Sequence, residues 1–359
     1  MSEPNLSSTE KIKQASDSLR GTIREGLSDD ITGAISEDDR ALVKFHGMYL
    51  QDDRDRRDER AEKKLERLYS FMIRLRLPGG LLSADQWLAT QDIAGEHSTG
   101  IIKITTRQTI QLHGLYKSHV KPTIQAFNEA SLHSIATCGD INRNVICSAH
   151  PKQSPLHGEV HAFAFKINEL LLPKTRAYYE IWLDQEKIAD KKEEEDPLYQ
   201  DRYLPRKFKI AIAIPPNNDV DVFGNDIGLI AIVENNQLKG FNVAIGGGLS
   251  STHGNPATYP RLGTIIGFVS GEEKILKTIY EIVTIQRDYG NRSDRSLARL
   301  KYTVDKMGWN GLRKRSSAGR DSRLKRKSPF SSRKERITMA GSRIRINTGT
   351  IPPLLRMDA

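Results

Sequence analysis

The sequence predicts an α+β fold in which helices pack on sheets, and three observations lead to this fold class. The 359 residues suit about two compact domains. Apolar and polar residues alternate as in strands over Phe71–Leu77 and again from Ile102 to about His113. Val120–Ala130 has helical periodicity and stands between sheet elements, a pattern typical of helices on one face of an antiparallel sheet.

The elements of the first region follow in order along the chain. Residues 1–35 are rich in Ser, Asp and Glu, which predicts a mobile arm with one short helix. The run Asp52–Arg67 mixes charges of both signs and is typical of a solvated helix. The strand Phe71–Leu77 ends at Pro78. The next strand carries one polar and basic face, formed by Lys103, Thr105, Arg107, Thr109, Gln111 and His113.

The second region, from about Cys138, mixes strands and helices. Strands are expected at Val145–Cys147, Tyr178–Leu183 and Phe208–Ile214, a hairpin at Ile227–Val233 and Phe241–Ala244, and helices at Gly158–Leu172, Glu272–Asp288 and Ser296–Met307. The charged run Asp190–Asp196 is interpreted as a loop. The tail from Gly311 lacks hydrophobic periodicity and is rich in Arg, Lys and Ser, which predicts disorder.

Charge is distributed unevenly along the chain. The formal net charge is +10, but residues 311–359 alone contain 14 basic and 3 acidic residues. Residues 1–310 contain 41 basic and 42 acidic residues and are nearly neutral. A nucleic-acid-binding function would therefore depend on the tail alone.

The two cysteines, Cys138 and Cys147, exclude a disulfide scaffold. They cannot supply four thiolates to zinc or to an iron–sulfur cluster, so we interpret both as small buried hydrophobes and predict no metal ligand. No apolar run reaches the roughly 18 residues of a membrane span. Met1–Gln14 is polar and lacks the apolar core of a signal peptide. These features predict a cytoplasmic protein.

Basic side chains recur in pairs on the predicted strands, whereas no Gly-x-Ser-x-Gly, Walker or His-Glu-x-x-His motif is present. The residues that share a face are Arg74 with Arg76, Lys103 with Arg107, and Lys207 with Lys209; Arg143 adds a further cation, and Gly246, Gly247 and Gly248 offer backbone N–H groups that can close on an anion. Converging Arg and Lys side chains suit a polyanionic ligand. Taken singly, each pair is more often an exposed strand face, and most glycine triplets are turns.

Long segments of the chain resemble the haemoprotein (beta) component of assimilatory NADPH-dependent sulfite reductase. The segments that carry this resemblance are Leu19–Gly33, Phe45–Asp55, Arg74–Gly80, Thr105–Gly114, Gly139–Ser148, Leu172–Lys187, Tyr203–Phe223, Gly240–Asn255 and Gln286–Thr303. They occur in the family's order from about residue 17 to Gly308, so the resemblance is specific.

The resemblance implies a six-electron reduction of sulfite to sulfide, in sulfate assimilation and cysteine biosynthesis. It implies sirohaem coupled to a 4Fe-4S cluster through a shared cysteine thiolate, and an NADPH-dependent flavoprotein component as partner, with neither membrane nor nucleic acid. Sirohaem carries several carboxylates and sulfite is an anion. The resemblance therefore implies that the basic side chains on the predicted strands bind these anions.

The resemblance also implies roles for individual residues. The sulfite-binding, catalytic residues are expected to be Arg74, Arg143, Lys207 and Lys209, with the lysines as proton sources. The residues expected to contact the cofactor are Lys103, Arg107, Gln111, His113, Gly246, Gly247, Gly248, Asn291 and Arg292. The family has an Arg-like cation where this chain has Lys103, so the charge is retained and the bidentate geometry is lost.

The chain departs from the family in two respects. The family's cluster ligands are two cysteine pairs in the second half of a longer chain, and neither pair is present here. The resemblance stops at Trp309. Read one base out of phase, codons allowed for three successive tail segments encode EWLKKEVERR, KPFLFTEREDNYGW and WHHTAFIENG, which resemble the family in the expected order. We therefore predict a frameshift near codon 309, an out-of-frame tail and a chain that is truncated and inactive.

The resulting architecture has four parts. Residues 1–35 form the N-terminal arm, residues 36–135 a ferredoxin-like half-domain, residues 136–309 an incomplete, mixed α/β sirohaem-binding domain, and residues 310–359 the basic tail. The alternative within the same chemistry is a ferredoxin-dependent sulfite or nitrite reductase. The alternative from another class is a non-catalytic anion-, tetrapyrrole- or nucleic-acid-binding protein.

Overall fold

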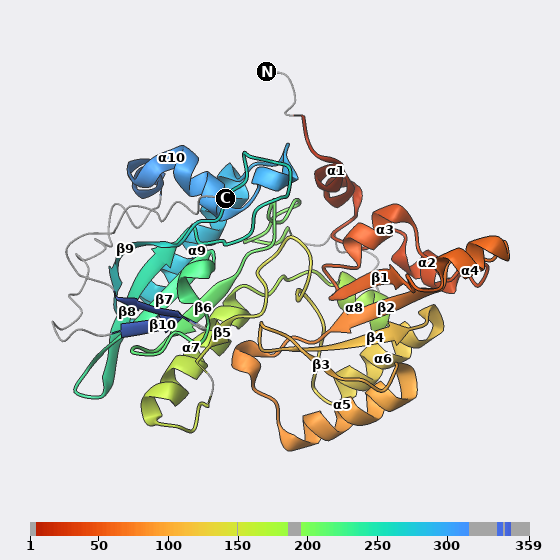
Figure 1. Cartoon of the computed structure of the whole chain (residues 1–359), viewed down its shortest axis with the longest axis horizontal. Coiled ribbons are helices and arrows are strands. Elements are labelled where there is room, and N and C mark those ends of the chain that lie inside the picture. Colours follow the sequence, from red (N-terminus) through yellow and green to blue (C-terminus); the bar gives the residue numbers. More distant parts are fainter. Residues whose placement is uncertain (1–4, 149, 186–194, 316–335, 340–341, 346–359) are drawn as a thin grey trace.

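The computed structural model describes residues 5–148, 150–185, 195–315, 336–339 and 342–345. A four-stranded and a five-stranded sheet form its two main parts, at the right and the left of Figure 1. One cluster of buried apolar side chains extends through both sheets and their helices. The predicted combination of an antiparallel α+β unit with a mixed α/β unit is confirmed.

The first sheet has the order β1-β2-β4-β3, and all neighbouring strands are antiparallel. Its strands are β1 (Met48–Asp52), β2 (Tyr69–Arg74), β3 (Lys103–Ile104) and β4 (Ile110–Leu115). Helix α5 (Ala84–His97) packs on α6 (Lys117–Glu129), which contacts β2. α5 begins at a capping box, in which the Ser83 hydroxyl accepts from the Gln86 N–H at 3.1 Å and the Gln86 side chain accepts from the Ser83 N–H.

The single strand predicted from Ile102 to His113 is instead a hairpin. The chain turns between β3 and β4, where the Thr105 N–H donates to the Thr109 carbonyl at 2.9 Å. Gln108 has φ of +50° in this turn. The prediction was wrong because no Gly, Pro or Asn marks the turn, and the side-chain alternation restarts on its far side.

The second sheet has the order β5-β6-β7-β8-β9, in which β5, β6 and β7 are parallel and the last two pairings are antiparallel. Its strands are β5 (Ile146–Cys147), β6 (Ile210–Ala213), β7 (Ile227–Glu234), β8 (Gln237–Ile245) and β9 (Thr264–Val269). The predicted β7–β8 hairpin is confirmed. Asn235 and Asn236 form its turn, both with positive φ, a conformation that asparagine tolerates well.

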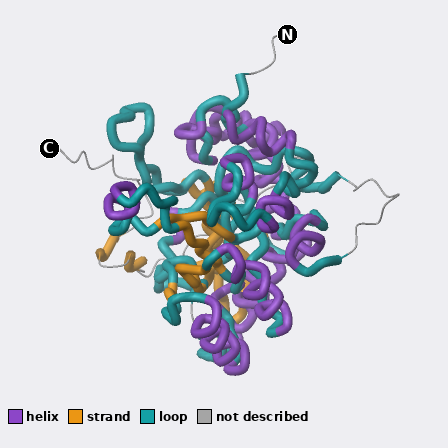
Figure 2. The backbone as a smooth tube through the Cα atoms, turned by 90° about the vertical axis from the view of Figure 1, so that its right-hand side faces the viewer, coloured by secondary structure: helices purple, strands orange, loops and turns teal. Residues whose placement is uncertain are grey.

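In the tube view of Figure 2, the orange strands lie toward the middle of the molecule and purple helices lie around them. Three helices belong to the second part of the molecule. These helices are α7 (Pro155–Leu170), α9 (Glu272–Tyr289) and α10 (Leu300–Arg315). α7 contacts β5 and β8, and α9 packs between α7 and α10. The three helices correspond to the three predicted in this region.

The predicted strand Tyr178–Leu183 is instead helix α8 (Ala177–Trp182). Its buried side chains Tyr178, Ile181 and Trp182 recur at helical spacing, which the aromatic composition obscured. The Trp182 indole donates to Nδ1 of His46 at 3.0 Å, so the helix is tied to the first region.

The predicted mobile arm is packed against the body of the protein. It contains α1 (Ser8–Ala15) and α2 (Ile23–Ser28), followed by α3 (Glu37–Leu42). Leu19 and Ile23 are buried in the common core. The prediction was wrong because the arm is held partly by buried ion pairs, which a low hydrophobicity does not reveal. The mixed-charge run does contain the exposed helix α4 (Arg57–Glu62).

Two predicted segments fall mostly outside the described residues. They are the charged loop Asp190–Asp196 and the basic tail 310–359. The described tail residues comprise the end of α10 and an antiparallel pair, β10 (Arg336–Met339) and β11 (Ser342–Arg345). None of the helices in the described ranges is both long and apolar enough to cross a membrane.

Candidate anion-binding site

Four cations predicted from the sequence lie on converging segments where the two sheets meet. We call Arg74, Arg143, Lys207 and Lys209 the cation cluster. Arg74 ends β2, and one Nη1 donor from each arginine reaches the same Thr137 carbonyl, at 3.4 Å from Arg74 and 3.0 Å from Arg143. The Arg143 backbone N–H donates to the Phe208 carbonyl at 2.8 Å, which places Arg143 beside the two lysines that flank Phe208.

The two lysines of the cluster are half-buried and carry unbalanced positive charge. Among the described residues, neither ammonium has a hydrogen-bond or ion-pair partner. Burial and the charges of Arg206 and Arg143 lower the pKa of Lys207 to about 8. Burial and the charges of Arg107 and Arg299 lower the pKa of Lys209 to about 8. Each ammonium is therefore prepared both to bind an anion and to release a proton near neutral pH.

The nearby carboxylate, Asp226, is already neutralised. It is fully buried and accepts from Arg299 at 2.8 and 3.2 Å and from the Lys209 backbone N–H at 2.9 Å. Asp226 therefore balances Arg299 and leaves the cation cluster with excess positive charge. Buried cations without counter-ions are unfavourable unless an anion binds among them.

A polar row crosses the first sheet beside Arg74. Gln111 of β4 is paired with Arg74 on one side and Lys103 on the other. With the amide oxygen turned toward β2, Gln111 accepts from Arg74 Nε at 2.8 Å and donates to His113 Nε2 at 3.1 Å. Burial and the charges of Lys103 and Arg74 lower the pKa of His113, which favours the neutral imidazole. The pairing of β3 with β4 thus brings Lys103 beside Gln111 and His113, although the sequence predicted a single strand for all three.

Arg107 lies in the β3–β4 turn and bridges the two sheets. Its Nη1 donates to Asn225 Oδ1 at 2.9 Å, and its Nη2 donates to the carbonyls of Asn144 and Ile210 at 2.6 and 3.0 Å. Burial and the charge of Arg143 lower its pKa to about 9. Its Nε is buried without a partner. Arg107 is expected to contact a cofactor, and these three contacts to the protein leave its buried Nε as a donor without a partner among the described residues.

The glycine triplet does not present free N–H groups. Gly246, Gly247 and Gly248 donate to the carbonyls of Asp226, Asn225 and Arg261 at 2.9, 3.0 and 2.7 Å. A Cβ on Gly247 would lie 2.1 Å from the Phe223 carbonyl oxygen. The expectation that these N–H groups close on an anion is therefore wrong. All three already donate to backbone carbonyls, and the triplet allows close backbone packing.

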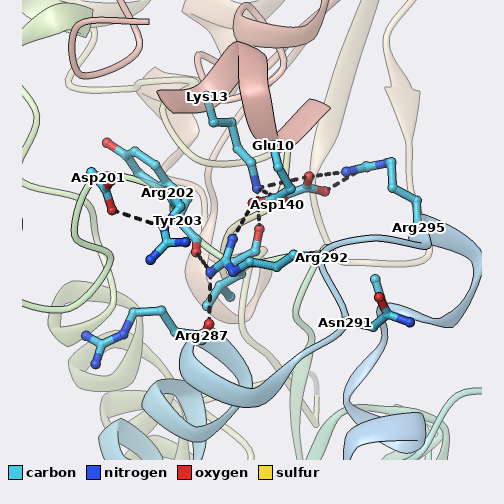
Figure 3. A network of polar contacts seen from close by, with 12 residues as sticks. Glu10, Lys13, Asp140, Asp201, Arg202, Tyr203, Arg287, Asn291, Arg292 and Arg295 are labelled. Atoms are coloured by element: carbon cyan, nitrogen blue, oxygen red, sulfur yellow. Dashed lines mark hydrogen bonds and ion pairs between the residues drawn. The ribbon is translucent and has the colours of Figure 1, made fainter. Parts of the chain in front are cut away.

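Asn291 and Arg292, both labelled in Figure 3, take part in structural contacts that include no member of the cation cluster. Asn291 Oδ1 accepts from the N–H groups of Ser293 and Asp294, which shapes the turn. Arg292 pairs with Glu10. The structure therefore does not bring these two predicted cofactor contacts to the cluster.

Sequence reasoning missed several residues of the site. They are Arg206, Arg299, Asp226 and Asn144. Arg206 directly precedes Lys207 in the chain, so its place beside the cluster could have been predicted from the sequence. The pairing of Arg299 with Asp226 spans 73 positions, so no local pattern reveals it. Asn144 Nδ2 donates to the Leu77 carbonyl at 2.6 Å and joins the two regions.

The described residues contain no group of three or more potential metal ligands. Both cysteines are buried and free. Burial and Asp219 raise the pKa of Cys147 to about 12, which keeps it a thiol. Cys138 accepts a contact from Arg74 Nη1 at 3.1 Å. A four-thiolate cluster therefore does not fit these two side chains.

Comparison with known proteins agrees with this architecture. Residues 64–130 match the nitrite/sulfite reductase ferredoxin-like half domain, and residues 163–321 match the nitrite and sulphite reductase 4Fe-4S domain. The chain thus carries two domains of the nitrite and sulphite reductase family.

The curated relatives of this chain are NADPH sulfite reductase hemoprotein beta-components. One from Leptospira biflexa is 66% identical over 299 residues, covering 83% of this chain and 54% of the relative. One from Staphylococcus saprophyticus is 53% identical over 326 residues, covering 90% and 57%. The chain thus spans about half the length of the curated relatives it matches.

Solved structures support the fold. The NirA protein of Mycobacterium tuberculosis aligns with a TM-score of 0.65 at 24% identity, covering 91% of this chain and 55% of that chain. Dissimilatory sulfite reductase I aligns with a TM-score of 0.53 at 11% identity, covering 87% of each chain. At these identities the likeness concerns the fold alone.

Proposed function

We propose that this chain forms the sulfite-binding part of an assimilatory sulfite reductase haemoprotein, which reduces sulfite to sulfide with six electrons. The observation that supports this most is the cation cluster, whose two half-buried lysines have no carboxylate partner in the described structure. Sulfite, a compact oxyanion, offers acceptors to two guanidinium forks and two ammonium groups at once.

The residues around the cluster suit a sirohaem-type macrocycle with peripheral carboxylates. Lys103 is exposed beside Gln111, His113 lies in the same row, and the buried Nε of Arg107 still needs an acceptor. Such donors would hold carboxylates and fix the plane of the group. When bound, that group would pass the electrons of an external donor to the substrate.

The chain's own residues would bind, orient and protonate the substrate. Arg74 and Arg143, fixed by the Thr137 carbonyl, would hold sulfite oxygens in place. As each S–O bond breaks, the oxygen leaves as water and consumes protons. Lys207 and Lys209 suit this transfer because their pKa values, about 8, lie near neutral pH.

The residues present do not fit the iron–sulfur cluster that the family implies. We therefore infer that the 359 residues by themselves bind sulfite but do not reduce it. By the names of the relatives, the partner would be the flavoprotein that supplies NADPH-derived electrons to the beta-component. Sulfide production by the purified chain with reduced methyl viologen would contradict this inference.

Calorimetric titration of the purified chain with sulfite tests the binding function, with nitrite titrated in parallel. We expect saturable sulfite binding that the double variant Lys207→Met/Lys209→Met abolishes. Tighter binding of nitrite than of sulfite would favour the nitrite reductase alternative. Unchanged sulfite binding in the double variant would contradict the proposal that the cation cluster binds sulfite.

The DNA across codons 300–320, read on both strands, tests the predicted frameshift. If this DNA sequence shows that a base is missing or extra, correcting that base should give a reading frame that continues the family sequence. An intact frame through Ala359 with no second frame continuing the family pattern would contradict the frameshift.

A further inference from the structure

A buried ion-pair network joins the N-terminal helix to the segments beside the cation cluster (Figure 3). We call Glu10, Lys13, Asp140, Arg292 and Arg295 the Asp140 network. Glu10 and Lys13 lie on α1 and are only 1% and 2% exposed. Lys13 pairs with Glu10, and Glu10 also pairs with Arg292. A charged pair so deeply buried on an eight-residue helix is unusual for a chain terminus.

Asp140 is the centre of this network. Arg295 approaches both of its carboxylate oxygens, at 2.5 and 3.0 Å, and Lys13 Nζ lies 3.8 Å away. Although burial pushes the pKa of Asp140 upward, the hydrogen bonds from Arg295 and the charge of Lys13 hold it below its ordinary value. Asp140 is therefore ionised and fixed from two directions.

The backbone around Asp140 connects the network with Arg143. Arg143 Nε donates to the carbonyl of Gly139, the neighbour of Asp140, at 3.1 Å. Gly139 has φ of +81°, and a Cβ there would lie 2.9 Å from the Phe45 ring. The carbonyl that orients Arg143 therefore belongs to a tight turn held in place by the Asp140 side chain.

The same network reaches the segment that carries the lysines. Lys13 Nζ donates to the Leu204 carbonyl at 2.8 Å, and the Leu204 N–H donates to the Asp140 carbonyl at 3.0 Å. Leu204 precedes Lys207 by three positions. Two of the three segments that supply the cation cluster, those of Arg143 and of the two lysines, are thus attached to Asp140 and to α1.

We propose that Asp140 is a positioning residue for the anion-binding site and that α1, through Lys13, holds it in place. Asp140 orients Arg143 and Lys207 through backbone contacts. Its pairing with Arg295 also keeps its negative charge from neutralising the cluster. The inference rests on the proposed function of the cluster, because positioning matters only where an anion binds.

The test compares Asp140→Asn with the matched control Asp39→Asn in the full chain. Asp39 is also buried, at 1% exposed, and also fixes the N-terminal segment, accepting from the Thr22 N–H at 3.0 Å and the Ser36 hydroxyl at 2.7 Å. The hydrogen bonds of the Asp39 carboxylate come from Thr22 and Ser36, and neither Gly139 nor Leu204 takes part in them. Both variants remove one buried carboxylate charge, so their comparison separates positioning from general stability.

Two measurements are made on each variant: the sulfite dissociation constant and amide hydrogen exchange at Arg143 and Leu204. We expect Asp140→Asn to weaken sulfite binding at least about fivefold, because small misplacements of binding groups cost affinity. We expect exchange at both amides to accelerate at least about tenfold through local opening. Asp39→Asn should leave both quantities within about twofold.

Equal effects of the two variants on both measurements would overturn the inference. If Asp140→Asn does not fold, Arg295→Lys replaces it, since it keeps the charge and loses the two-pronged contact. If the unmodified chain binds no sulfite, the proposed function fails. In that case, hydrogen exchange at Arg143 and Leu204 still tests whether Asp140 holds the two segments in place. Unchanged exchange in Asp140→Asn would overturn this positioning role.

Discussion

The cation cluster and the Asp140 network are two partly buried groups of charges that differ in how their cations are paired. In the network, Lys13, Arg292 and Arg295 each contact a carboxylate, from Glu10 or Asp140. In the cluster, the described residues provide no carboxylate partner for Lys207 or Lys209, and their pKa values fall to about 8. Cations paired with carboxylates indicate structural support, whereas partly buried cations without such a partner indicate a place for a ligand.

The largest expected effect comes from removing the carboxylate that neutralises Arg299. Asp226→Asn leaves a buried cation unpaired beside the cluster. We expect the free energy of unfolding to fall by about 3–5 kcal/mol. Urea denaturation measures this loss. The control is Asp305→Asn, which breaks the exposed ion pair with Arg261 and should lower the free energy of unfolding by at most about 1 kcal/mol. Equal losses in the two variants would show that burial does not distinguish the two carboxylates.

Arg143→Ala tests whether the cluster binds an anion through its guanidinium groups. A hydrogen bond to a charged group contributes about 1.5–3 kcal/mol, so the sulfite dissociation constant should rise roughly tenfold to hundredfold. Calorimetry measures it. Arg40→Ala, at an exposed pair with Glu37, is the control. Equal affinities in the two variants would contradict the assignment of Arg143.

Gly247→Ala tests whether the glycine triplet serves packing or binding. The added Cβ would meet the Phe223 and Asn225 carbonyls at 2.1 and 2.5 Å. We expect a loss of about 1–3 kcal/mol in unfolding free energy, with sulfite affinity retained by the folded fraction. Gly95→Ala, on the open surface of α5, should instead stabilise by about 0.5–1 kcal/mol. A selective loss of sulfite binding in Gly247→Ala would restore the triplet to the site.

The smallest expected effect is a pH dependence caused by the cluster lysines. Because their pKa values are lowered to about 8 from 10.5, the cluster loses charge as pH rises through about 8. Affinity for sulfate, whose charge is constant in this range, should fall up to about tenfold between pH 7 and pH 9.

Stability should change in the opposite sense. Between about pH 8 and 10.5 the unfolded chain binds more protons at these lysines than the folded chain. The unfolding free energy without an anion should therefore rise with pH in this window. Lys207→Met/Lys209→Met should flatten both pH profiles, and an unchanged slope in this variant would assign the dependence to other groups.

Regular side-chain patterns made much of the fold predictable. The β7–β8 hairpin, the strand containing Arg74 and helices α6, α7 and α9 followed from periodicity. Patterns failed where tertiary contacts override local preference. The aromatic segment of α8 is helical because its buried face packs on His46, and the hairpin at Gln108 has no turn residue to announce it.

The candidate site was predictable to the extent that its residues are charged and closely spaced. Lys207 and Lys209 flank Phe208 just before β6, and Arg143 lies in the resembling segment Gly139–Ser148. The engagement of Arg107 by Asn225, or of Asp226 by Arg299, joins positions far apart in the chain. Such pairings depend on how the sheets meet, which no local pattern encodes.

The sequence by itself determined the fold class, the family and the excess of cations on particular strands, because composition, periodicity and segment order are properties of the chain. Only the tertiary structure decided which cations remain unbalanced. It placed Asp226 on Arg299 and Asp140 between Lys13 and Arg295. The physical reason is that a charge binds a ligand or supports the fold according to its neighbours in space, and folding chooses those neighbours.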